Sequence, residues 1–313
     1  MNQQILTLGF SSCPNDTFIF DALIHHKIDT EGLEFKLFIA DVEELNRKAF
    51  KAELDISKIS FSAYTQLTTN YILLDSGSAL GENCGPLLIS KKPFDLKDLS
   101  NKKIAIPGLN TTANLLISHA FPNANNKVEM LFSNIESAVL NGDVDAGLII
   151  HESRFTYQEK GLHKLMDVGE FWETETNTPT PLGGIIAKRS LDEELLQKVN
   201  RVLHRSLEFA FANPKSGLNF IRSHSQEMSE EVMYKHIALY VNNFSLSLGI
   251  SGRAAVIKLF EVAKQLGKIN KIPQNLFLEN QSFSNQSFIN LSSIFHQSFI
   301  NLPSIFSNQS FLK

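Results

Sequence analysis

The sequence has few cysteines, only a small excess of one charge over the other and no long apolar runs, and each shortage argues against a class of protein. Its two cysteines, Cys13 and Cys84, form no Cys-x-x-Cys pair, which argues against a thiolate metal site or a redox pair. With 29 basic and 33 acidic residues, the net charge of −4 gives no electrostatic reason to expect nucleic acid or an anionic membrane as a partner. No apolar run approaches the roughly 20 residues that span a bilayer.

Several catalytic signatures are absent as well. The chain has no Gly-x-Gly-x-x-Gly, no Walker loop, no His-Glu-x-x-His and no Gly-x-Ser-x-Gly. Nucleotide-binding, zinc-hydrolase and serine-hydrolase functions therefore lose most of their support. The first ten residues, MNQQILTLGF, lack the basic start and the long apolar stretch of a signal peptide, so we expect a cytoplasmic protein.

Short apolar runs alternate with helical patterns along most of the chain. The 313 residues, 43% of them hydrophobic, are enough for two domains or one large one. The alternation occurs twice before a helical C-terminal part, which predicts an α/β fold with mostly parallel sheets. We expect one lobe from residues 1–90 with 188–278 and a second from 91–187. A site in such a fold belongs in the cleft, at the C-terminal ends of the strands.

The end of the chain, residues 279–313, has a different composition. QSFINLSSIF (286–295) and QSFINLPSIF (297–306) repeat with a period of eleven, and two copies cannot stack into a solenoid. Asn, Gln and Ser with interspersed Phe are typical of low-complexity sequence. We therefore expect a disordered tail without a catalytic role.

Small polar residues gather where the predicted strands end. The turns concerned are Ser11–Asp16, Ser57–Ser60, Gly108–Thr112 and His151–Arg154. Such residues often cap helices, and Pro14 followed by Asn15 and Asp16 has the pattern of a helix start. Helix N-termini also bind anions, so four such turns at strand ends fit a carboxylate or polyol ligand as well as they fit caps.

His151, which follows the apolar strand DAGLII, is the candidate catalytic residue. The unperturbed pKa of histidine lies near neutrality, so a histidine at a strand end can act as a general base, although a structural hydrogen-bonding role is the commoner one. Arg154 could bind an anionic substrate. The isolated Lys58 is expected to face a carboxylate, either Asp55 or a ligand. The other histidines show no partner spacing and are interpreted as surface or packing residues.

Seven segments together resemble the 1,4-dihydroxy-6-naphthoate synthase family of the futalosine route to menaquinone. They are SSCPNDTFIFDAL, DVEELN, DISKISFSAY, GSALGENCGPLL, PGLNTTANLL, DAGLIIHESRFTY and TPLGGI, and the resemblance covers roughly residues 3–275. The family pattern usually begins Ser-Pro-Cys-Pro-Asn-Asp. Here Ser12 replaces the first proline, which loosens the turn but keeps Asn15 and Asp16.

The resemblance implies a type 2 periplasmic-binding-protein-like α/β fold with a cleft between two lobes. It also implies a carbon–carbon lyase that converts cyclic de-hypoxanthine futalosine to 1,4-dihydroxy-6-naphthoate and dihydroxyacetone, without a metal or an organic cofactor. The family's base falls on His151. The resemblance also implies substrate-binding roles for Ser57, Lys58, Ile59, Thr111 and Thr112. Asn15, Asp16 and Arg154 from the strand-end turns complete the expected substrate-binding set.

Two other functions stay open. One is a non-catalytic solute-binding protein of the same fold, against which the absence of a signal peptide counts. The other is the sister enzyme chorismate dehydratase, although the IHESR and SCPNDT turns favour the naphthoate synthase. We expect a small-molecule carboxylate substrate and no nucleic-acid or membrane partner, and the sequence leaves a homodimer open.

Overall fold

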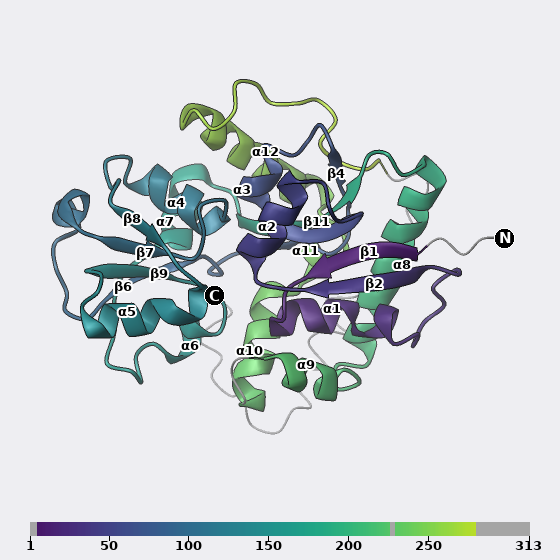
Figure 1. The fold of residues 1–313 in the computed structure, drawn as a ribbon, viewed down its shortest axis with the longest axis horizontal. Coiled ribbons are helices and arrows are strands. Elements are labelled where there is room, and N and C mark those ends of the chain that lie inside the picture. The colour runs from purple at the N-terminus through teal and green to yellow at the C-terminus, as the bar shows by residue number, and fades with distance from the viewer. Residues whose placement is uncertain (1–4, 226–228, 280–313) are drawn as a thin grey trace.

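The protein forms two lobes, each built on a β-sheet with helices on both faces (Figure 1). The structure is a computed structural model and describes residues 5–225 and 229–279. Both lobes are assembled from segments that lie far apart in the sequence, because the chain passes from the first sheet to the second and back again.

The first sheet has the strand order β2-β1-β3-β11-β4, and β5 also pairs with β11. Its strands are β1 (Ile5–Phe10), β2 (Glu34–Ile39), β3 (Ile56–Ser60), β4 (Tyr71–Leu73), β5 (Ala79–Gly81) and β11 (Thr180–Lys188). β1 pairs in parallel with β2 and β3, whereas β11 runs antiparallel to its three partners.

The second sheet has the order β10-β6-β9-β7-β8. Its strands are β6 (Leu87–Ser90), β7 (Ile104–Ile106), β8 (Lys127–Glu129), β9 (Ala146–Ile149) and β10 (His163–Asp167). β7 is parallel to β8 and β9, and β6 is antiparallel to β9 and β10. Both sheets are therefore mixed, and the expectation of mostly parallel sheets is wrong, because the strands next to the lobe crossings enter their sheets in the reverse direction.

The helices around the first sheet come from both ends of the described chain. They are α1 (Pro14–Ile24), α2 (Val42–Phe50), α3 (Phe61–Tyr64), α8 (Glu193–Ala212), α9 (Leu218–His224), α10 (Glu230–Tyr240), α11 (Asn243–Leu246) and α12 (Gly249–Gln265). The second sheet carries the 3-10 turns η1 (Leu96–Asn101) and η2 (Phe132–Asn134), with α4 (Thr112–Ala120), α5 (Ile135–Asn141), α6 (Ser153–Thr156) and α7 (Val168–Thr176).

Three buried apolar clusters hold these layers together. One joins β1 to α1, α8 and α10, and another lies between the second sheet and α5. The third runs through both lobes, from Tyr64 and Phe260 on the first to Leu115 and Trp172 on the second. Because burial of apolar side chains is the main stabilising term in folding, this shared cluster couples the two lobes.

The strands at the crossings lie in the opposite lobe from the one expected. β6 ends at Ser90 and belongs to the second sheet, whereas β11 starts at Thr180 and belongs to the first. An apolar strand does not reveal in its own sequence which sheet it joins, so the boundaries after residues 90 and 187 were placed too late. Of the expected tail 279–313, all but Glu279 lies outside the described residues.

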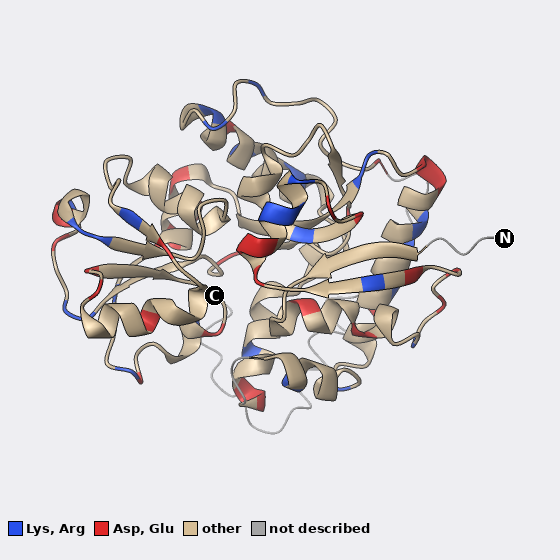
Figure 2. Cartoon of the chain, in the orientation of Figure 1, with Lys and Arg blue, Asp and Glu red and all other residues tan. Residues whose placement is uncertain are grey.

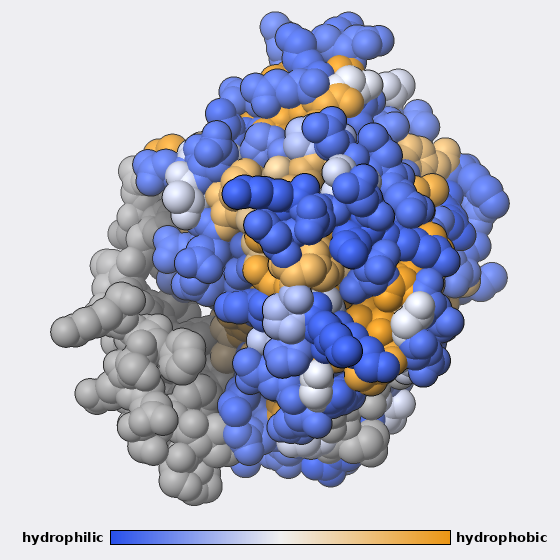
Figure 3. Space-filling view, turned by 90° about the vertical axis from the view of Figure 1, so that its left-hand side faces the viewer, coloured by the Kyte–Doolittle hydropathy of each residue, from blue (hydrophilic) through white to orange (hydrophobic). Residues whose placement is uncertain are grey.

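Charged residues of both signs are interspersed over both lobes (Figure 2). The face seen in Figure 3 is largely hydrophilic, with smaller apolar patches between the polar side chains. Within residues 5–225 and 229–279, no helix has both the length and the apolarity that crossing a bilayer requires.

Candidate active site

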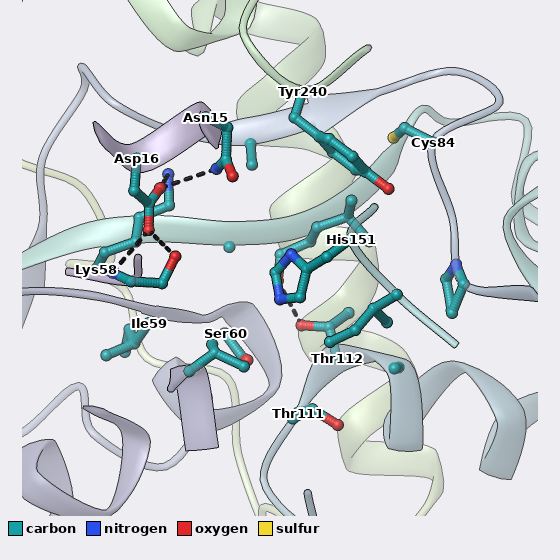
Figure 4. Close-up of a pocket in the computed structure, with 18 residues that line it drawn as sticks. Asn15, Asp16, Lys58, Ile59, Ser60, Cys84, Thr111, Thr112, His151 and Tyr240 are labelled. Carbon is teal, nitrogen blue, oxygen red and sulfur yellow. Dashed lines mark hydrogen bonds and ion pairs between the residues drawn. The ribbon is translucent and has the colours of Figure 1, made fainter. Parts of the chain in front are cut away.

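A pocket lies where strand ends of the two lobes meet (Figure 4). Its interior volume is about 90 Å³, several times the roughly 10–15 Å³ that one water needs on the same measure. The sequence-predicted residues that line it are Asn15, Asp16, Lys58, Ile59, Thr111, Thr112 and His151. The fold thus gathers most of the candidate residues at one place.

The turn after β1 is organised by the carboxylate of Asp16. Its Oδ2 accepts hydrogen bonds from the backbone N–H of Ser11 (3.1 Å) and from the Ser11 hydroxyl (2.7 Å), and its Oδ1 accepts one from Nδ2 of Asn15 (2.9 Å). α1 begins at Pro14 with Cys13 as the N-cap, so neither Asn15 nor Asp16 is the cap residue. Both side chains are therefore available to the pocket wall.

Lys58 completes this wall as the partner of Asp16. Its Nζ lies 3.5 Å from Oδ1 of Asp16 and donates to the carbonyl of Gly77. Burial lowers the pKa of Lys58, and the charge of Asp16 opposes that shift. Asp55, the other partner considered, instead pairs with Lys188 at 3.0 Å. The wall therefore presents a buried ion pair rather than an isolated cation.

The N-terminus of α4, in the second lobe, lines the pocket beside this wall. The Thr111 hydroxyl caps the helix by accepting from the N–H of Asn114 (3.2 Å), and it donates to the Gly108 carbonyl. The Thr112 hydroxyl donates to the carbonyl of Leu182 (2.7 Å). Both hydroxyls are thus used within the chain. The backbone N–H groups of Thr112 and Ala113, which have no intrahelical acceptor, are the groups left for an anion.

His151 stands at the end of β9 in a backbone conformation that few residues adopt. Its φ is +58°, in the left-handed region, and a non-glycine residue held there often marks a functional site. Its Nε2 is buried without a hydrogen-bond partner, and its ring meets Phe132 edge-on at 4.9 Å. Burial lowers the pKa of His151 to about 4, while the carboxylate of Asp16 acts in the opposite direction. The imidazole is therefore neutral at pH 7.

Three polar residues of this region are absent from the predicted site: Ser60, which was named only as the end of a strand-end turn, Tyr240 and His236. Ser60 and Tyr240 line the pocket. His236 is fully buried behind it, where its Nε2 lies 2.9 Å from Oδ1 of Asn15 and its ring stacks on His151 at 5.9 Å. His236 had been interpreted as a surface or packing residue. The only sequence pattern that connects His236 to the site is its four-residue spacing to Tyr240. This spacing places both residues on one face of α10 but does not indicate that this face meets the pocket.

Two predicted binding residues do not line the pocket. The side chain of Ser57 is completely buried and its hydroxyl donates to the Lys58 carbonyl (3.2 Å), because alternation along β3 turns it away from the Lys58 side. Arg154 donates to Oδ2 of Asp167 (2.6 Å) and to the carbonyl of Asn83 (2.8 Å). Its guanidinium therefore anchors the chain crossing instead of facing a substrate.

Contacts between α2 and the second lobe close one side of the cleft. The Glu43 carboxylate accepts hydrogen bonds from the backbone N–H of Asn110 (3.2 Å) and from its side-chain amide (2.6 Å). A Cβ at Gly108 would lie 2.5 Å from Oε2 of Glu43, so only glycine allows this approach. Arg47 pairs with Glu129 across the same gap. These contacts hold the lobes together around the pocket.

One group of possible metal ligands occurs among the described residues. The Sγ of Cys13, a ring nitrogen of His151 and a carboxylate oxygen of Glu152 lie within 4.8 Å of one another. Burial raises the pKa of the Cys13 thiol well above its ordinary value, which disfavours the thiolate form that binds a metal.

Comparison with known proteins places the chain in a family. A family model described as menaquinone biosynthesis matches residues 6–265. The chain belongs to this family. It is 42% identical to the 1,4-dihydroxy-6-naphthoate synthase of Thermus thermophilus over 88% of this chain and 100% of that protein. It is 38% identical to the synthase of the same name from Streptomyces coelicolor, over 86% and 96% of the two chains.

Solved structures confirm the expected fold. A protein of Archaeoglobus fulgidus is 35% identical, with a TM-score of 0.81 over 86% of this chain and all of that one. The periplasmic aliphatic sulphonate-binding protein of Escherichia coli has a TM-score of 0.59 at 12% identity, over 92% and 98% of the two chains. The family of menaquinone-biosynthesis enzymes to which this chain belongs therefore has a periplasmic-binding-protein-like fold with two lobes.

Proposed function

We propose that the chain is a carbon–carbon lyase that converts cyclic de-hypoxanthine futalosine to 1,4-dihydroxy-6-naphthoate and dihydroxyacetone, with His151 as the general base. The observation that carries this proposal is the neutral His151 imidazole, which lines the pocket and whose Nε2 has no hydrogen-bond partner. A neutral imidazole carries one nitrogen lone pair that can accept a proton, as a general base requires. The relatives named as naphthoate synthases support the choice of reaction.

The substrate carboxylate would bind at the N-terminus of α4. The backbone N–H groups of Thr112 and Ala113 lie in its first turn, and both residues line the pocket. A helix N-terminus carries partial positive charge and free donors, which suits an anion. The paired Lys58 and Asp16 offer a donor and an acceptor to hydroxyl groups of the sugar-derived part, without a net charge of their own.

The reaction we propose needs one proton to be moved twice. Neutral His151 takes a proton from the sugar-derived part of the substrate, and a carbon–carbon bond then breaks. The electron pair of that bond leaves with the three-carbon fragment, which takes the proton back from the imidazolium as the remaining ring becomes aromatic. The carboxylate of Asp16 favours the charged form of His151 and would stabilise the intermediate imidazolium.

The closed cleft would supply much of the rate by positioning. Orienting a substrate against a catalytic group lowers the barrier by up to about 7–11 kcal/mol in favourable cases. The contacts of Glu43 and Arg47 with the second lobe would keep water out once the substrate is bound.

Incubation of the purified protein with cyclic de-hypoxanthine futalosine, followed by mass spectrometry, tests the proposal. We expect equal amounts of dihydroxynaphthoate and dihydroxyacetone. A parallel incubation with chorismate tests the sister reaction, and calorimetry with both compounds tests simple binding. Dehydration of chorismate, or tight binding of either compound without turnover, would overturn the proposal.

A further inference from the structure

His236 connects the two walls of the pocket without lining it. On one side its Nε2 lies 2.9 Å from Oδ1 of Asn15, in the turn after β1. On the other side its ring lies parallel to that of His151, with 5.9 Å between the centroids and 20° between the planes. The side chain is completely buried and packs against Tyr240 on its own helix. A titratable ring in this position is not explained by apolar packing alone.

The hydrogen bonds around Asn15 determine which nitrogen of His236 carries the proton. The terminal atom of Asn15 that lies 2.9 Å from Asp16 must be its amide nitrogen, because a carboxylate only accepts hydrogen bonds. The other terminal atom is then the oxygen, which also only accepts. The His236 nitrogen that faces this oxygen must therefore be protonated. Burial and the neighbouring His151 lower the pKa of His236 well below its ordinary value, so the ring is the neutral Nε2–H tautomer.

The competing tautomer would disturb the whole chain of contacts. With its proton on Nδ1, which lies 3.9 Å from Oε2 of Glu152, His236 would turn a lone pair toward Asn15. The Asn15 amide would then flip to donate to His236 and would turn its oxygen toward the Asp16 carboxylate. Two acceptors would face each other, and Asp16 would lose one of the donors that hold it beside Lys58.

We propose that His236 is a positioning residue, whose Nε2–H holds the Asn15 amide in the orientation that keeps Asp16 facing Lys58 on the pocket wall. This inference rests on the proposed function for its effect on turnover. His236 itself need not touch the substrate. It sets the direction of the polar groups that would hold the sugar-derived part and stabilise protonated His151.

Two substitutions separate positioning from packing. His236→Gln keeps an N–H donor that can reach Asn15, and we expect kcat/KM within about threefold of the wild type. His236→Leu removes the donor, and we expect a loss of about tenfold, the size of one hydrogen bond to a polar partner. His119→Leu is the control, because His119 likewise has one buried ring nitrogen without a hydrogen-bond partner but lies outside the pocket. Equal losses in the Gln and Leu variants would overturn the inference.

A double-mutant cycle tests whether His236 acts through Asn15. If it does, His236→Leu costs less than twofold in an Asn15→Ala background, because the group it orients is already gone. Losses that multiply in the double variant would mean that His236 acts by another route.

Nitrogen-15 NMR of histidine-labelled protein tests the geometry independently of activity. We expect a neutral His236 ring with the proton on Nε2, and a resonance of the Asn15 amide that shifts in His236→Leu but not in His119→Leu. A proton on Nδ1 would overturn the inference. If the wild-type protein does not turn over the proposed substrate, the proposed function fails while this measurement still decides the role of His236.

Discussion

The two turns that face each other across the pocket differ in how completely their polar atoms are bonded. In the turn after β1, Asp16 accepts three hydrogen bonds and pairs with Lys58. In the turn after β9, His151 holds a left-handed backbone conformation and its Nε2 has no hydrogen-bond partner. A polar group that is fully bonded resists change, whereas a buried group without a partner is poised to accept one.

This difference assigns separate tasks to the two walls. The turn after β1 provides a fixed arrangement of charges, which costs little to reorganise during a reaction because it is already in place. The turn after β9 provides the proposed base, His151, whose proton affinity is set by its surroundings. Substitutions in the first turn should therefore act on stability as well as on turnover, and substitution of His151 mainly on turnover.

The largest effect is expected from His151→Gln. Loss of a general base typically costs a factor of about 10²–10⁴, and we expect kcat/KM for naphthoate formation to fall within that range. The free energy of unfolding should change little, since Nε2 has no hydrogen bond to lose. His119→Gln serves as the control. Unchanged turnover in His151→Gln would remove this residue from the mechanism.

The second-largest effect is expected from Lys58→Met, as a loss of the free energy of unfolding measured with urea. The substitution leaves the carboxylate of Asp16 buried without its cation, and breaking a buried pair in this way costs about 3–5 kcal/mol. In an Asp16→Asn background the same substitution should cost much less. An equal cost in both backgrounds would show that the pair does not stabilise the turn.

The acid stability of the protein should depend measurably on His151. Its pKa is about 4 in the folded state and near 6.5 when unfolded, so the unfolded state binds more protons below pH 6.5. The stabilising contribution is complete above pH 6.5 and is lost as the pH falls toward 4. The wild type should therefore lose more free energy of unfolding between pH 7.5 and pH 4.5 than His151→Gln does. Identical pH dependences would mean that burial does not hold His151 neutral.

Arg154→Gln should separate anchoring from substrate binding. Loss of the charged hydrogen bonds to Asp167 and the neighbouring carbonyls is expected to reduce the free energy of unfolding by about 1.5–3 kcal/mol. KM should stay within twofold, because the guanidinium does not line the pocket. A large rise in KM at unchanged stability would restore Arg154 as a binding residue.

Ser57→Ala should have the smallest effect. The hydroxyl makes one hydrogen bond, to the Lys58 carbonyl, and such a bond contributes about 0.5–1.5 kcal/mol. We expect kcat/KM within twofold of the wild type in the same steady-state assay. A loss above tenfold would contradict the placement of this side chain behind the pocket wall.

Local patterns predicted the parts of the site that depend on strand ends. Alternating apolar runs and helix starts indicated two lobes with a cleft, and Asp16 and His151 stood at strand ends where the cleft was expected. The partner of Lys58 was harder to predict from the sequence. Asp55 lies near it in sequence, but residues an odd number of positions apart point to opposite faces of a strand. The true partner, Asp16, comes from a neighbouring strand's turn.

Tertiary contacts explain what the sequence left out. His236 lies on a C-terminal helix, and nothing in its neighbourhood along the chain indicates that it meets Asn15. Arg154 is close to His151 in sequence, yet the turn at α6 directs it toward Asp167. The direction of β6 and β11 is set by the crossings between lobes, and their apolar sequences fit either direction equally well.

The pH dependence of kcat/KM for the wild-type protein would show whether the cleft keeps a neutral His151 ready to take a proton. The acid limb of this profile reports the pKa of the base in the free enzyme. We expect an acid limb well below pH 6.5, near the folded-state pKa of His151 of about 4, and we expect it to disappear in His151→Gln. A limb at pH 6.5 or above, or one that survives the substitution, would contradict this expectation.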